Sequence, residues 1–187
     1  MKKTGKLLRQ EPPNAVQFEL IEGCNLRCSF CGLQGIREEK DKSLKMMNPK
    51  SIKGIVEDMV NLGWNPRIEF AMHGEPTLHP DAASMIAAVR EAAPKYHIMM
   101  TSNGGGLLKK PGPMANINEL FDAGLNILAL DDYRHANIVP KIRRAVIDYQ
   151  DRVGIDGGHP ESEMGFKFYD YPKQNEGNPH MRRRPNE

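Results

Sequence analysis

Residues 67–103, RIEFAMHGEPTLHPDAASMIAAVREAAPKYHIMMTSN, contain a complete strand, helix and strand pattern. Residues 67–72 predict a strand, residues 80–93 a helix that stops before Pro94, and residues 97–101 a second strand. A helix that joins two strands of one sheet in a right-handed crossover leaves those strands parallel. This stretch therefore predicts one βαβ unit and, with it, a parallel sheet.

The same alternation continues on both sides of this unit. Further strands are predicted at residues 16–20, 127–130 and 165–169, and further helices at residues 49–62, in a short segment ending at Gly124, and at residues 138–149. Strands that alternate with helices at a spacing of roughly thirty residues indicate successive βαβ crossovers. The predicted fold class is therefore α/β, with a parallel sheet that is either open or curled into a barrel.

Local signals mark the ends of several of these elements. Asn48 and Pro49 are typical of a helix start, and Gly63 stands where a C-terminal cap belongs. The buried stripe predicted for this helix is Ile52, Ile55, Val56 and Met59. Glycines 104–106, after the third strand, predict a tight turn with positive φ.

The length of 187 residues suits a single domain. We expect an N-terminal extension at residues 1–14, a core domain at residues 15–170 and a polar, proline-bearing tail at residues 171–187. No sixth strand is predicted after Asp170, so the predicted barrel is incomplete at its C-terminal end.

Charge and hydropathy exclude several classes of protein. Charged residues make up 27% of the chain and apolar residues 39%, and no apolar run approaches the roughly 20 residues of a spanning helix. No long apolar stretch follows the lysines of residues 1–10, so no signal peptide is predicted. We expect a cytoplasmic protein with no membrane contact. Nucleic acid is not expected as a partner, because the net charge is only +2 and the one dense basic run, Arg182–Arg184, lies in the tail.

The three cysteines of the chain all lie within the segment CNLRCSFC, which has the spacing CxxxCxxC. An odd number of closely spaced thiols is poor material for disulfides and good material for a metal. When Cys24, Cys28 and Cys31 bind a cubane of four irons, one iron keeps an open position. The spacing therefore predicts a 4Fe-4S cluster with room for the amino and carboxylate groups of a small molecule. Asn25 and Arg27 offer polar groups near such a cluster.

A structural zinc site is the alternative interpretation of the same thiols. Zinc takes four ligands, and its cysteines and histidines are commonly arranged in two pairs. The chain has one cysteine cluster only, so a histidine would have to complete the site, and His73 is the best candidate.

The segment CxxxCxxC with an aromatic residue before its last cysteine, here Phe30, resembles the signature of the radical SAM superfamily. His73-Gly74-Glu75-Pro76-Thr77-Leu78, after the second strand, resembles the Gly-Glu-Pro turn of the same family. The resemblance spans about residues 15–170. It implies a partial six-stranded βα barrel, a (β/α)6 TIM-like barrel, of which this sequence shows five strands. It departs from the relatives that carry a cysteine-rich C-terminal domain, so the chain is either a minimal core or a truncated one.

The resemblance also implies a set of cofactor-binding residues. Gly74, Glu75 and Pro76 would contact the methionyl amino group of S-adenosylmethionine (SAM) through the backbone. Ser102 and Asn103, with Asp131, fall where the family places groups for the ribose and methionyl ends. Arg134 would pair with the SAM carboxylate. The cofactors implied are therefore a 4Fe-4S cluster and SAM.

The activity implied is reductive cleavage of SAM to methionine and a 5′-deoxyadenosyl radical, which then abstracts hydrogen from a substrate. The cluster would receive its electron from a low-potential donor of the flavodoxin or ferredoxin type. We expect the substrate to be a peptide or a protein. Two other hypotheses stand beside this one: a degenerate cluster-binding barrel with a binding or assembly role, and an interaction module stapled by zinc.

Overall fold

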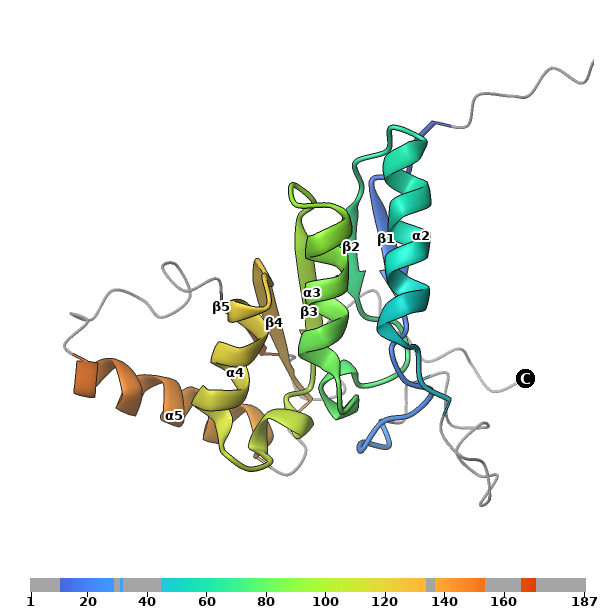
Figure 1. Cartoon of the computed structure of the whole chain (residues 1–187). Coiled ribbons are helices and arrows are strands. Elements are labelled where there is room, and N and C mark those ends of the chain that lie inside the picture. Colours follow the sequence, from blue (N-terminus) through green and yellow to red (C-terminus); the bar gives the residue numbers. More distant parts are fainter. Residues whose placement is uncertain (1–10, 29–30, 32–44, 134–136, 154–165, 171–187) are drawn as a thin grey trace, which may run out of the picture.

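Five strands form one parallel sheet in the computed structural model, which describes residues 11–28, 31, 45–133, 137–153 and 166–170. The strands are β1 (Ala15–Phe18), β2 (Arg67–Phe70), β3 (Ile98–Ser102), β4 (Ile127–Asp132) and β5 (Phe166–Asp170). Their spatial order follows the chain, β1-β2-β3-β4-β5, and every neighbouring pair is parallel. The prediction of an α/β fold with a parallel sheet is therefore confirmed (Figure 1).

Strand boundaries differ from the predicted ones at the edge where strands end. Ser102 is the last residue of β3, and Asp131 and Asp132 close β4 instead of following it. They remain in the ladder because Ser102 pairs with Leu130 and Asp132 pairs with Asp170. Polar side chains at the carboxyl ends of these strands are consequently held by the sheet itself.

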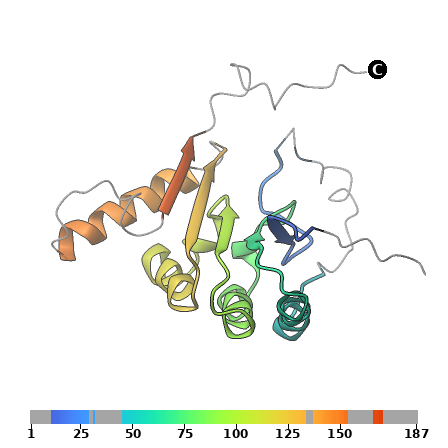
Figure 2. The same cartoon turned by 90° about the horizontal axis from the view of Figure 1, so that it is seen from above.

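Three helices cover one face of the sheet. They are α2 (Pro49–Asn61), α3 (Ala82–Ala92) and α4 (Pro113–Asp122), which lie side by side and are seen nearly end-on in Figure 2. Helix α5 (Ile138–Val153) lies apart from this row, beyond β4, and runs across the view. Among the described residues, no helix is long and apolar enough to cross a membrane.

The caps predicted for the first of these helices are confirmed. The Asn48 side chain accepts a hydrogen bond from the Ser51 N–H at 2.8 Å, Pro49 opens the helix, and Gly63 follows it with φ +72°. The predicted stripe is wrong at one position, because Ile55 is 44% exposed while Ile52, Val56 and Met59 are buried. Residue 55 lies at the margin of the apolar face, where a small rotation of the helix about its axis decides whether a side chain is buried.

Two short 3-10 helices were not predicted, η1 (Pro76–Leu78) and η2 (Gly105–Leu108). They follow β2 and β3 and pack against each other at the carboxyl edge of the sheet. A Cβ on Gly106 would stand 1.8 Å from the Thr77 carbonyl oxygen, so only glycine permits this approach. Of the three predicted turn glycines, Gly104 alone has positive φ, at +77°. Gly106 is required by this close contact with backbone, whereas a Cβ on Gly105 would meet the side chain of Asn25 at 2.2 Å.

The amino edge of the sheet is tied together by one arginine. The Arg90 guanidinium, on α3, donates four hydrogen bonds of 2.6–2.8 Å. Their acceptors are the carbonyls of Pro94, Tyr96 and Gly124 and the side-chain oxygen of Asn126. These acceptors lie on the segments that lead into β3 and β4, so Arg90 holds two strand entrances against one helix.

The predicted domain boundaries can be compared only with the residues that the structure describes. The predicted core, 15–170, contains every helix and strand of the described residues. The tail at 171–187 and most of the extension at 1–14 lie outside them, so these two boundaries stay predictions.

Candidate cofactor site

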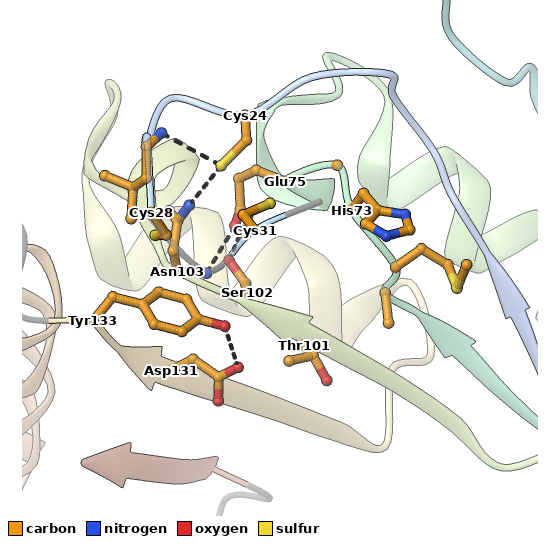
Figure 3. A pocket seen from close by; sticks show the side chains of 14 residues that line it. Cys24, Cys28, Cys31, His73, Glu75, Thr101, Ser102, Asn103, Asp131 and Tyr133 are labelled. Carbon is orange, nitrogen blue, oxygen red and sulfur yellow. Dashed lines mark hydrogen bonds between the residues drawn. The ribbon is translucent and has the colours of Figure 1, made fainter. Parts of the chain in front are cut away.

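A cavity of about 300 Å³ opens at the carboxyl edge of the sheet. Four parts of the chain line it: the cysteine segment after β1, the turn after β2, the end of β3 with the residue that follows, and the end of β4 (Figure 3). Its volume is at the lower end of the range of small-molecule sites. Functional sites of βα folds gather at this edge, because there the loops after successive strands meet.

Most of the predicted site residues meet in this cavity. Those that line it are Cys24, Cys28, Cys31, Gly74, Glu75, Ser102, Asn103 and Asp131. Pro76 is buried at the start of η1, next to the lining residues. Phe30 and Arg134 lie outside the described residues, so their predicted roles stay predictions.

The sulfur of Cys24 is the best defined of the three thiols. It accepts hydrogen bonds from the Leu26 backbone N–H at 3.4 Å and from Asn103 Nδ2 at 3.3 Å, as the dashed lines of Figure 3 show. Cys28 is buried, and its carbonyl accepts a hydrogen bond from the Cys31 N–H at 3.0 Å. N–H groups aimed at sulfur suit a thiolate, which is the form that binds iron.

Three thiols at one cavity are a set of donors that fits an iron–sulfur cluster. Within residues 11–28, 31, 45–133, 137–153 and 166–170, no three Cys, His, Asp or Glu side chains converge closely enough to hold a metal ion. Three cysteines line one cavity, and the thiolates of a 4Fe-4S cluster each bind a different iron, so they need not converge on one ion. His73, the predicted zinc ligand, is exposed at the cavity and completes no such group.

Glu75 joins the turn after β2 to the end of β3. One carboxylate oxygen accepts from the Thr77 N–H at 3.0 Å and from the hydroxyls of Thr77 and Ser102, both at 2.5 Å. The other accepts from the Asn103 N–H at 2.7 Å. We call this set, Glu75 with Thr77, Ser102 and Asn103, the Glu75 bridge. Both carboxylate oxygens of Glu75 are therefore engaged within the protein.

The environment of Glu75 acts on its carboxyl group in two directions. The side chain is only 3% exposed, and this burial raises the pKa of Glu75 above its ordinary value. The hydrogen bonds from Ser102, Thr77 and Asn103 favour the charged form and oppose that rise. Backbone N–H groups face both oxygens, so the site is built for a carboxylate acceptor.

The cysteine segment is held directly against the Gly-Glu-Pro turn. The Glu75 N–H donates to the Gly23 carbonyl at 2.7 Å, and the Gly74 N–H donates to the Glu19 side chain at 2.8 Å. A Cβ on Gly74 would stand 1.8 Å from the Ile21 carbonyl oxygen. Glycine is therefore required at position 74 for the two segments to meet.

Asp131 places a second carboxyl group in the cavity. It is 6% exposed and accepts a hydrogen bond from the Tyr133 hydroxyl at 3.0 Å. Burial raises the pKa of Asp131 to about 6, an effect that the charge of Glu75 enhances and the Tyr133 hydrogen bond opposes. Asp131 can thus change its protonation state near neutral pH, and with it its role as donor or acceptor.

Several site residues were not predicted or were predicted differently. Thr77 and Tyr133 were missed, although each stands one or two residues beyond a predicted site residue, at the end of a strand or turn. Arg27, expected near the cluster, is exposed. His79 is the C-cap residue of η1; it is 5% exposed, and its ring bonds the Met47 carbonyl and the Asp81 N–H.

Comparison with known proteins identifies the family. Residues 18–155 match the Radical SAM superfamily. Members of this family use a 4Fe-4S cluster and SAM, which confirms the predicted cofactors at the level of the family.

Curated relatives with similar sequences are named GTP 3′,8-cyclase. The protein of Paenarthrobacter nicotinovorans is 30% identical over 148 residues, which are 75% of this chain and 38% of that protein. GTP 3′,8-cyclase 2 of Mycobacterium tuberculosis is 28% identical over 137 residues, 70% of this chain and 35% of that protein. The chain thus spans little more than a third of the length of these relatives.

Solved structures of BtrN have the same fold. BtrN in complex with AdoMet and 2-DOIA superposes with a TM-score of 0.63 at 19% identity, covering 84% of this chain and 56% of that one. BtrN in an open conformation gives a TM-score of 0.59 at 16% identity, covering 88% of this chain and 58% of that one. Because the family match extends over well more than half of the residues, this chain belongs to the radical SAM superfamily.

Proposed function

We propose that the chain is the catalytic core of a radical SAM enzyme, with Cys24, Cys28 and Cys31 as cluster ligands. The observation that carries this proposal is the meeting of three thiols, a buried Gly-Glu-Pro turn and two buried carboxyl groups at one cavity. When bound, the cluster supplies an electron for reductive cleavage of SAM, and the resulting 5′-deoxyadenosyl radical abstracts hydrogen from a substrate.

The chain's own residues bind and position the cofactors in this proposal. The Glu75 bridge holds the turn after β2 in place, so that the backbone of residues 73–76 can contact the methionyl amino group. Asp131, near the end of β4 and in the lining of the cavity, accepts a hydrogen bond from a ribose hydroxyl when it is ionised. Buried polar groups are worth more here than in water, since the cavity is partly screened from solvent.

Two candidate substrates are proposed, one from the names of the relatives and one from the sequence analysis. The relatives named GTP 3′,8-cyclase act on GTP, and the matched region contains the cavity. The predicted peptide or protein substrate is the second candidate. Both are assayed by the same readout, because 5′-deoxyadenosine formation above the background without substrate reports hydrogen abstraction.

The partner in this proposal is a low-potential electron donor of the flavodoxin or ferredoxin type. The cluster has to be reduced from outside, since the donor's electron is consumed when SAM is cleaved. Replacing such a donor by dithionite should sustain SAM cleavage, with GTP as the first substrate probe.

Anaerobic reconstitution with iron and sulfide tests the proposal. The wild-type protein should become brown, bind about four irons per chain and cleave SAM. Cys28→Ala should abolish both the colour and 5′-deoxyadenosine formation. Val56→Ala is the matched control. It also truncates a buried side chain, but one on α2 that does not line the cavity, so the variant should keep the cluster.

The other outcomes separate the alternative hypotheses. A brown protein that does not cleave SAM would support the degenerate cluster-binding barrel. A colourless protein purified with zinc would support the zinc-stapled module. A wild-type protein with neither iron nor sulfide after reconstitution contradicts the proposed function.

A further inference from the structure

Asn103 uses its whole side-chain amide on neighbours within the site. Its Nδ2 donates to Cys24 Sγ at 3.3 Å and to Asn25 Oδ1 at 3.1 Å, and its Oδ1 accepts from the Gly105 N–H at 2.7 Å. The side chain is 4% exposed. Both ends of the amide are therefore engaged, and one of its hydrogens is directed at a cysteine sulfur, as Figure 3 shows.

The surroundings of Asn103 hold it in this orientation. Its backbone N–H donates to Glu75 Oε2 at 2.7 Å, which fixes the start of the turn after β3. A Cβ on Gly105 would stand 2.2 Å from Asn25 Nδ2 and 2.9 Å from Asn103 Oδ1. Glycine at position 105 therefore leaves the space in which the two asparagines meet above the cysteine segment.

We propose that Asn103 is a positioning residue for the cluster: it orients Cys24 and raises the reduction potential of the cluster by donating a hydrogen bond to the Cys24 thiolate. This inference rests on the proposed function. It assigns Asn103 to the cluster side of the cavity, whereas the resemblance implied a contact with SAM.

The expected effect on potential follows from charge. Reduction adds a negative charge to the cluster and its thiolates, so an N–H donor at sulfur stabilises the reduced form more than the oxidised form. Among the described residues, the Leu26 N–H and the Asn103 amide donate to Cys24 Sγ. Removing the Asn103 amide takes one of these donors away and should make the cluster harder to reduce.

The test is a redox titration of the reconstituted protein followed by electron paramagnetic resonance. Asn103→Leu keeps a similar side-chain volume and removes the donor. At a fixed poise, its ratio of reduced to oxidised cluster should fall roughly five- to tenfold, the equivalent of one hydrogen bond. Iron retention during gel filtration should fall in parallel, by roughly tenfold.

A matched control separates the hydrogen bond from general damage to the fold. Asn116 Nδ2 also donates two hydrogen bonds, to the carbonyls of Leu107 and Lys109, away from the cysteines. Asn116→Leu is the same substitution at this second asparagine and should leave the potential at the wild-type value. A purely structural role for Asn103 would reduce the amount of cluster without moving the potential of the clusters that form.

A second variant decides the matter if Asn103→Leu does not fold. Asn103→Asp keeps the size and the acceptor for the Gly105 N–H but places a carboxylate beside the sulfur. A lower potential of the clusters that form supports the inference, whereas less iron at a wild-type potential would show a purely structural role and overturn it. A wild-type potential with full iron content in either Asn103 variant overturns it. Failure of the wild-type protein to bind iron would instead refute the proposed function.

Discussion

At the amino edge of the sheet an arginine joins two strand entrances, and at the carboxyl edge a glutamate joins two strand exits. Arg90 donates four hydrogen bonds, three of them to backbone carbonyls, and Glu75 accepts four, two of them from backbone N–H groups. The two residues thus perform the same structural task with opposite charge.

The two edges differ in burial and in what lies beside them. Glu75 is 3% exposed and lines the cavity with the three cysteines, whereas the Arg90 contacts are partly exposed and distant from the cavity. Water can replace a lost partner at the amino edge but not at the carboxyl edge. In βα folds the amino edge serves stability and the carboxyl edge serves chemistry, and the same division appears here.

The largest effect is expected for Glu75→Gln. The amide nitrogen must replace one of two oxygens that each accept from a backbone N–H, so a donor meets a donor in a buried site. The free energy of unfolding should fall by roughly 2–4 kcal/mol, and iron content should fall with it. Urea unfolding and iron analysis measure the two effects.

Glu69→Gln is the control for this change on the neighbouring strand. Glu69 is partly buried, but its partners Gln17 and Arg67 are exposed, so the same substitution should cost less than about 1 kcal/mol and leave the iron content unchanged. Equal losses in the two variants would show that burial of Glu75 does not matter, and the comparison of the two edges would lose its basis.

A smaller, pH-dependent effect is expected at Asp131. An unfolded aspartate loses its proton near pH 4, whereas burial raises the pKa of Asp131 to about 6 in the folded protein. The folded state therefore binds more protons in this window, and the free energy of unfolding should fall by about 2–3 kcal/mol as pH rises from about 4 to 6. Asp131→Asn should remove this contribution in urea unfolding of the apoprotein.

Tyr133→Phe sharpens the same measurement. The Tyr133 hydroxyl lowers the pKa of Asp131, so its loss should raise that pKa and extend the window above pH 6, by less than about 1 kcal/mol. If the pH dependence of wild type and Asp131→Asn were the same, Asp131 would not titrate in this window.

At the amino edge, Arg90→Met should have a smaller effect on stability than Glu75→Gln. Loss of the guanidinium should lower the free energy of unfolding by about 1–2 kcal/mol, because its acceptors can partly rehydrate. Iron per folded molecule and SAM cleavage per cluster should stay at wild-type values. Arg144→Met, which removes an exposed arginine 3.7 Å from Asp148 on α5, should change stability by less than about 0.5 kcal/mol. An iron content that falls with Arg90→Met would contradict the separation of the two edges.

Most of the fold was predictable because its signals are local. Alternation in strands and a stripe of apolar residues in helices involve neighbours within a few positions, so β2, α3 and β3 were found close to their observed bounds. The 3-10 helices η1 and η2 were missed because each is a single turn, and what stabilises them is contact with the other. The prediction that Ile55 is buried was wrong for a related reason, since its exposure depends on how α2 is rotated against the sheet.

The candidate site was predictable in its residues but not in its contacts. The positions of Gly74, Glu75, Ser102, Asn103 and Asp131 at strand ends followed from the pattern of strands. The direction in which each side chain points could not be predicted from that pattern. Glu75 carries a charge that a sequence pattern assigns to solvent or ligand, and the structure instead buries it among donors from two segments.

The amino-acid sequence by itself determined the chemistry at the cysteines, because the number and spacing of thiols are properties of the chain alone. Tertiary structure decided which polar groups surround them. Asn103 and Cys24 are 79 residues apart in the chain. Their hydrogen bond exists only because the parallel order of β1, β2 and β3 brings three strand ends to one edge, where burial removes competing water.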